Sequence, residues 1–102
     1  MIIYNTTFSV DPSVVNEFVE WIRGTYLPKA LEGDRLTSPQ LMRIMAQQEG
    51  GVAYALQLQA PSLGDLQRWY QSTGKDLTAL MTSHFGQRIV GFSTMMEKIE
   101  ID

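Results

Sequence analysis

Two runs of alternating residues joined by a glycine pair constrain the fold of this chain most. From Met42 to Ala46, and again from Val52 to Leu58, apolar residues recur at every second position. Period two is typical of half-buried strands, and Gly50-Gly51 between two such runs is typical of a hairpin turn. The sequence therefore predicts an antiparallel hairpin, with strands near residues 40–48 and 52–60.

The register of this hairpin is predicted from burial. A two-residue loop at Gly50-Gly51 would set Ile44 beside Gln57, an apolar residue beside a polar one. Slipping by one residue moves every side chain to the other face, so burial favours a loop of Glu49, Gly50 and Gly51, with Gly51 left-handed. The resulting pairs are Met42 with Leu58, Ile44 with Leu56, and Ala46 with Tyr54. The second face then carries Arg43, Met45, Ala53, Ala55 and Gln57.

The rest of the chain adds two strands and two helices. Alternation predicts strands near residues 2–10 and 88–98. Apolar residues at steps of three and four predict helices near residues 12–31 and 62–85, with a kink near Ser72-Thr73-Gly74. Asp11 before Pro12 is expected to cap the first helix, and Ser62 with Asp65 forms a capping box for the second. Trp69 and His84 both fall on the apolar stripe of the second helix.

The order β-α-β-β-α-β predicts an α+β, ferredoxin-like fold with a four-stranded antiparallel sheet, spanning residues 1–102 as one domain. Both helices would cover one face of the sheet, which includes Tyr4, Phe8, Ile44, Leu56 and Phe92. The opposite face would show Ile3, Asn5, Met45, Ala53, Ala55, Ile89 and Met95. An exposed surface this apolar is unusual on a monomer. We therefore expect a second copy of the chain to bury it, in a homodimer packed sheet against sheet.

Composition excludes several function classes. The net charge of −3 and the lack of a Lys/Arg cluster argue against a nucleic-acid partner. Without cysteine, disulfides, thiol catalysis and Cys-based metal sites are excluded. No apolar run reaches the ~20 residues of a membrane span, and the N-terminus lacks the pattern of a signal peptide. A soluble, cytoplasmic protein is therefore expected.

The chain also resembles a known family. The stretches MIIYNTTF, YLPKAL, LTSPQLMRI, EGGVAYALQ, SLGDLQRWY and FGQRIVGFSTMME are similar to a family of small proteins described only as a domain of unknown function. More distantly, the architecture resembles the dimeric α+β barrel superfamily. That superfamily includes cofactor-free monooxygenases of the antibiotic-biosynthesis type, haem-degrading monooxygenases, muconolactone isomerases, and binding or regulatory domains. The resemblance implies a dimer and brings no catalytic residues for the near family.

Two groups of candidate site residues can be named. Arg43 and Gln57 are cross-strand neighbours in the favoured register, and with Asn5 they could bind a carboxylate or carbonyl group between two sheets. Alternatively, Arg43 pairs across the dimer and Gln57 bonds to backbone. Asn5, Trp69 and His84 match the residue types that haem-degrading members of the superfamily use. The fifteen residues from Trp69 to His84 exceed that arrangement, so the favoured interpretation is that both residues pack structurally.

His84 is the single histidine, so no multi-histidine metal site can form, and no cofactor is expected. Two functional classes follow. The first is a homodimeric, non-catalytic module that binds a small molecule or a partner. The second is a cofactor-free or haem-type monooxygenase or isomerase that works in a cleft on the open sheet face. The lack of a convergent acid–base pair favours the first class.

Overall fold

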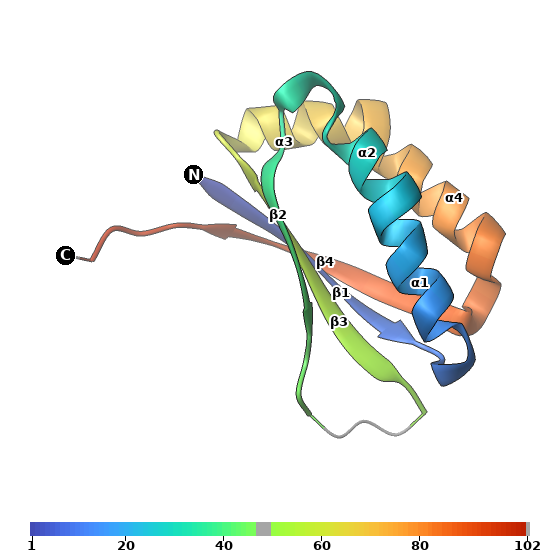
Figure 1. The fold of residues 1–102 in the computed structure, drawn as a ribbon. Coiled ribbons are helices and arrows are strands. Elements are labelled where there is room, and N and C mark those ends of the chain that lie inside the picture. Colours follow the sequence, from blue (N-terminus) through green and yellow to red (C-terminus); the bar gives the residue numbers. More distant parts are fainter. Residues whose placement is uncertain (47–49, 102) are drawn as a thin grey trace.

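The computed structural model describes residues 1–46 and 50–101, and it confirms the predicted order of strands and helices. The strands are β1 (Ile2–Val10), β2 (Thr37–Arg43), β3 (Val52–Ala60) and β4 (Ile89–Glu97). The helices are α1 (Val15–Trp21), α2 (Leu27–Ala30), α3 (Leu63–Trp69) and α4 (Lys75–Phe85). The described strands form one antiparallel sheet in the order β2-β3-β1-β4, so β2 and β4 are its edges. All four helices lie on the same face of the sheet (Figure 1).

The core lies between that face and the helices. Tyr4, Phe8 and Val10 of β1 and Leu56 and Leu58 of β3 are buried there. The helices contribute Phe18, Ile22, Leu66, Trp69, Leu77 and Phe85. The predicted apolar stripes therefore do pack on the sheet, apart from Tyr70, Leu80 and His84, which are exposed. None of the helices in the described ranges is both long and apolar enough to cross a bilayer.

Both predicted helix caps are confirmed. The Asp11 carboxylate accepts a hydrogen bond from the backbone N–H of Ser13 at 2.9 Å. The Ser62 hydroxyl accepts one from the backbone N–H of Asp65 at 3.1 Å and donates one to the Asp65 carboxylate at 2.8 Å. These bonds satisfy N–H groups that the first turn of a helix leaves without an intrahelical partner. The Ser13 hydroxyl, followed by the Ser13 backbone N–H, lowers the pKa of the Asp11 carboxyl, and the Ser62 hydroxyl lowers that of Asp65, because hydrogen bonds to a carboxylate favour its charged form.

Each helical arm is interrupted by one π-helical turn. The turns span Ile22–Tyr26, between α1 and α2, and Tyr70–Gly74, between α3 and α4. The second turn lies where the sequence predicted a kink. Gly74 explains its position, because a Cβ atom there would lie 2.6 Å from Cζ3 of Trp69 and 2.8 Å from Cδ1 of Tyr70. The closely packed glycine thus lets the Trp69 ring fit against the turn.

Alanine substitutions in the two π-helical turns are expected to have opposite effects on stability. Gly74→Ala overpacks the core against Trp69 and should lower the free energy of unfolding by about 1–3 kcal/mol. Gly24→Ala places its Cβ atom in open space and should raise that free energy by about 0.5–1 kcal/mol through helix propensity. Urea denaturation of the two variants measures both changes. Equal effects at the two glycines would contradict the close packing at Gly74.

The predicted hairpin register is wrong by three residues. Met42 lies opposite Ala55, not Leu58, and Leu41 lies opposite Leu56. β2 also begins and ends earlier than predicted, and Gly50, not Gly51, has the left-handed φ of 77°. The first residue of the predicted loop, Glu49, lies outside the described residues. The burial argument failed because β2 is an exposed edge strand, in which only Leu41 is half-buried, so burial selects its register weakly.

The two faces of β4 are also the reverse of those predicted. Ile89 is buried against the helices, whereas Val90 and Phe92 are 61% and 66% exposed on the other face. Gly91 accounts for this orientation, since it lies opposite Phe8, where a Cβ atom would be 3.0 Å from Cδ1 of the Phe8 ring. A strand turned over would place a bulky side chain against that ring. Ile44 and Met45, predicted in the core and on the opposite face respectively, lie beyond the end of β2 and are exposed.

The face of the sheet without helices, which we call the open face, is uncharged but less apolar than predicted, since half of its residues are polar. Its members follow from the strand register: Ile3, Asn5, Thr7 and Ser9; Gln40 and Met42; Ala53, Ala55, Gln57 and Gln59; Val90, Phe92, Thr94 and Met96. All of these residues lie in the described strands, and none of them is charged. In a chain with 19% charged residues, this is a distinctive surface.

Candidate functional site

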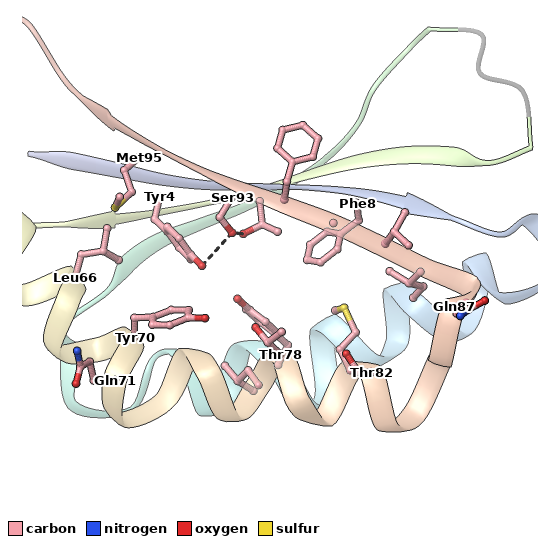
Figure 2. A pocket seen from close by; sticks show the side chains of 18 of the residues that line it. Tyr4, Phe8, Leu66, Tyr70, Gln71, Thr78, Thr82, Gln87, Ser93 and Met95 are labelled. Atoms are coloured by element: carbon pink, nitrogen blue, oxygen red, sulfur yellow. Dashed lines mark hydrogen bonds between the residues drawn. The ribbon is translucent and has the colours of Figure 1, made fainter.

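A large cavity lies between the sheet and the helices, on the face opposite the open face. Its volume is about 760 Å³. Side chains of β1 and β4, including Tyr4, Ser93 and Met95, form one wall, and α3, α4 and the π-helical turn between them form the other (Figure 2). The cavity reaches β4, an edge strand that is exposed along most of its length. We refer to it as the β4–α4 pocket; it lies on the other side of the sheet from the cleft that the sequence predicted.

A chain of three hydroxyl groups lies on the sheet side of the pocket. The Ser93 hydroxyl donates a hydrogen bond to the Tyr4 phenol oxygen at 3.1 Å, and it lies 3.0 Å from the Thr6 hydroxyl. Since Ser93 donates to Tyr4, Thr6 is left to donate to Ser93, and the Tyr4 proton points to no protein acceptor within the described residues. Hydroxyl groups in such a chain polarise one another and strengthen the terminal donor. The chain therefore offers a hydrogen-bond donor, Tyr4, to the interior of the pocket.

The two π-helical turns supply two further tyrosines. Tyr26 ends the first turn and Tyr70 begins the second, and both line the pocket. Burial raises the pKa of the Tyr26 phenol, with a smaller upward contribution from Tyr4. Tyr26 is therefore a neutral phenol at physiological pH, able to donate a hydrogen bond and unable to act as a base. Single π-helical turns are frequent at functional sites, and here each one places a tyrosine on the pocket wall.

The lining of the pocket carries no charge. Its described residues are apolar, hydroxyl-bearing or amide-bearing, and no Asp, Glu, His, Lys or Arg is among them. An ionised ligand would lose its hydration without gaining an ion pair, at a cost of several kcal/mol. A neutral ligand with an acceptor oxygen would instead meet apolar walls and phenol donors. Proton abstraction by the pocket has no candidate base in the lining.

Trp69 lies behind the pocket wall and does not line it. The side chain is fully buried, and its indole N–H donates to the backbone carbonyl of Ala30 at 2.8 Å. Its ring meets Tyr4 edge to face, with 5.5 Å between the ring centroids. This contact holds the Tyr4 ring from the core side, so Trp69 acts on the pocket through Tyr4.

Of the predicted ligand-binding group, the structure brings two residues together. Asn5 and Gln57 are directly opposite each other on the open face, whereas Arg43 lies opposite Tyr54 and is exposed. The predicted pairing of Arg43 with Gln57 is therefore wrong, since it depended on the wrong register; Gln57 lies opposite Gln40 instead. The amide of Asn5 donates to the Thr7 hydroxyl at 3.2 Å. None of Asn5, Arg43 and Gln57 borders the pocket.

His84 lies at the far end of α4, outside the pocket lining. Its Nε2 atom is 2.9 Å from the Glu17 carboxylate, and its ring stacks on Trp21 at an angle of 17°. The prediction that His84 faces the core is wrong, because the side chain is 48% exposed. The three residues thus lie apart: Asn5 is on the open face, Trp69 is in the core, and His84 is on the outer surface of the helices. They do not converge on a haem site, and the described residues hold no cluster of three or more potential metal ligands among His, Cys, Asp and Glu.

The sequence interpretation missed the residues that form the pocket. Thr78 and Thr82 of α4 were not among the predicted site residues, and the β4 parity that includes Ile89 and Ser93 was predicted to face away from the helices. One signal was available, since Thr78 and Thr82 are four residues apart, next to Leu77 and Met81 on the apolar stripe. Because β4 was predicted with the wrong face toward the helices, no residues of the sheet were expected opposite Thr78 and Thr82, and the pocket was not predicted.

Solved structures similar to this one share its fold. HapK from Hahella chejuensis matches with a TM-score of 0.76 and 10% identity, over 100% of this chain and 96% of that chain. A monooxygenase from the gene ActVA-Orf6 of Streptomyces coelicolor, solved with Nanaomycin D, matches with a TM-score of 0.71 and 17% identity, over 99% and 89%. A structure described as an antibiotic biosynthesis monooxygenase matches with a TM-score of 0.68 and 15% identity, over 98% and 100%. At these identities the likeness establishes the ferredoxin-like fold and no more.

Comparison of the sequence with curated proteins gives no match. The family model for the domain of unknown function DUF4286 matches residues 1–99. This match covers almost the whole chain and agrees with the resemblance that the sequence motifs predicted. The chain belongs to the DUF4286 family.

Proposed function

We propose that this protein binds a neutral, largely apolar small molecule in the β4–α4 pocket. The observation that carries the proposal is the pocket itself: about 760 Å³, uncharged, with the phenols of Tyr4 and Tyr26 among its polar groups. Pockets of this size and character are typical of small-molecule sites. A hydrogen-bond acceptor on the ligand, such as a carbonyl oxygen, would meet the Tyr4 hydroxyl at the end of the chain from Thr6 and Ser93. The ligand is held by contact and hydrogen bonding, without catalysis.

A pair of tryptophan substitutions on α4 tests this binding. Thr82→Trp fills the pocket, whereas Ala79→Trp adds the same side chain on the same helix at a residue outside the lining. Nile red, a neutral planar dye with a carbonyl group, is the probe. We expect its fluorescence titration to show binding to the wild type and to Ala79→Trp, with at least tenfold weaker binding to Thr82→Trp. Equal affinity of the two variants would contradict the proposal.

We also propose that the protein is a homodimer joined through the open face. Four strands of up to nine residues give a face of roughly 30 by 19 Å, so two copies would bury about 1,100 Å² in projection, above the ~1,000 Å² expected of a specific interface. The face is uncharged, so two copies of this acidic chain meet there without repulsion. Asn5 and Gln57 at its centre carry donors and acceptors alike, so each amide can pair with its counterpart in a second copy.

The second candidate function is oxygenation of a bound substrate without a cofactor, supported by the monooxygenases among the structural neighbours. The pocket has room for such a substrate, but its lining offers no base to ionise it. Oxygen consumption with a bound hydroquinone would distinguish the two candidates. Binding without oxygen uptake above the uncatalysed rate supports the non-catalytic function.

A further inference from the structure

Two residues of β4 belong to both surfaces of interest. Val90 and Phe92 lie opposite Ser9 and Thr7, which places them on the open face. Both also border the β4–α4 pocket, together with Gly91 and Ser93, which face the helices. Because β4 is an edge strand, the pocket reaches the free edge of the sheet and extends to side chains of the opposite face. The mouth of the pocket and the rim of the open face are therefore one continuous surface.

In the single chain, this shared rim is not covered. Val90 is 61% exposed and Phe92 is 66% exposed. β4 is exposed on both faces after Ile89, and the pocket residues Thr78 and Thr82 on α4 are exposed as well. A ligand in the pocket of one chain would thus remain partly in water on the β4 side. A binding site normally encloses most of its ligand, so this pocket lacks a wall.

We propose that a second copy of the chain supplies that wall, so that dimerisation and ligand binding are coupled. This inference rests on the proposed small-molecule site. The uncharged, self-complementary open face identifies the occupant as a second copy, and a copy seated there covers Val90 and Phe92. Those two side chains are then fixed between the partner and the ligand. Thermodynamic linkage makes the coupling reciprocal: dimerisation tightens ligand binding, and the ligand tightens the dimer by the same factor.

The test measures Nile red affinity against assembly state. Ala55→Glu places a charge at the centre of the open face, away from the pocket, and is expected to yield the monomer. We expect the monomer to bind the dye about tenfold more weakly than the wild-type dimer. The double variant Ala55→Glu/Thr82→Trp measures dye binding outside the pocket, including binding to the uncovered open face. Its signal is subtracted from that of Ala55→Glu. In the wild type alone, affinity should fall as the protein is diluted through its dimer dissociation range.

The reciprocal arm uses sedimentation velocity. Saturating Nile red should lower the dimer dissociation constant of the wild type by the same factor, about tenfold, and should leave that of Thr82→Trp unchanged. The coupling is contradicted if the Ala55→Glu monomer binds the dye as tightly as the dimer does. It is also contradicted if the wild type binds the dye while remaining a monomer. Both outcomes leave the proposed binding function intact. If the wild type dimerises and no dye enters the pocket at any concentration, the binding function itself fails, and the coupling fails with it.

Discussion

Trp69→Ala is expected to cause a larger loss of stability than any other single truncation in this core. The indole fills the space between Tyr4 and the π-helical turn at Gly74, and it is fully buried. Truncation of a buried Trp costs about 3–5 kcal/mol through lost burial and the cavity left behind. The carbonyl of Ala30 also loses its hydrogen bond, at a further cost of about 1–3 kcal/mol. Against a typical domain stability of about 5–15 kcal/mol, the variant should be largely unfolded or close to it.

Two control variants separate these contributions. Trp69→Phe keeps much of the ring but removes the N–H donor, so its loss should be smaller. Trp21→Ala removes the other tryptophan, which is only half-buried beside Tyr26 and Phe85, and should cost clearly less than Trp69→Ala. Urea denaturation followed by circular dichroism compares the three. A loss at Trp69 no larger than that at Trp21 would contradict the central position of Trp69 in the core.

Ala55→Glu is expected to have the largest effect on assembly. Ala55 lies opposite both Thr7 and Met42, in the middle of the open face. A glutamate there remains solvated in the single chain, so the fold should tolerate it. In the dimer the charge would be buried without a partner, at a cost of about 3–5 kcal/mol. The dimer dissociation constant should therefore rise by about two to four orders of magnitude.

Light scattering coupled to size exclusion measures this change, with Ala79→Glu as the matched control. Ala79 is exposed on α4, far from the open face, so the control adds the same charge without touching the interface. We expect a dimer for the wild type and for Ala79→Glu at micromolar concentration, and a monomer for Ala55→Glu. A wild type that elutes as a monomer would contradict the interface.

The parts of the fold that the sequence predicted correctly are those set by local chemistry. Asp11 and Ser62 cap their helices because the side chain reaches backbone N–H groups two or three residues away. The break at Gly74 likewise follows from the position of one glycine in an apolar stripe. These signals, with the order of strands and helices, were enough for the architecture.

The errors arose in strands where both sets of alternating positions carry apolar residues, or where neither set is buried. In β4, Ile89 and Met95 alternate with Val90, Phe92 and Met96, so periodicity cannot choose the buried face. The choice is made by the fit of Gly91 against the Phe8 ring, a contact between distant parts of the chain. The pocket was missed for the same reason, since Ser93 faces α4 only with this parity. In β2, the sheet edge leaves most of the strand exposed, and burial could not fix its register.

The measurement that tests the central claim most directly is a two-dimensional ¹H–¹⁵N NMR titration of the wild type with 2-naphthol, a small neutral aromatic alcohol. Binding in the β4–α4 pocket predicts the largest shift changes at the backbone amides of Gly91, Ser93 and Thr82, and at the side-chain amides of Gln71 and Gln87, all lining residues. The side-chain amides of Asn5 and Gln57, on the open face, should move far less. Changes centred on Asn5 and Gln57, or no saturable changes at all, would contradict the account.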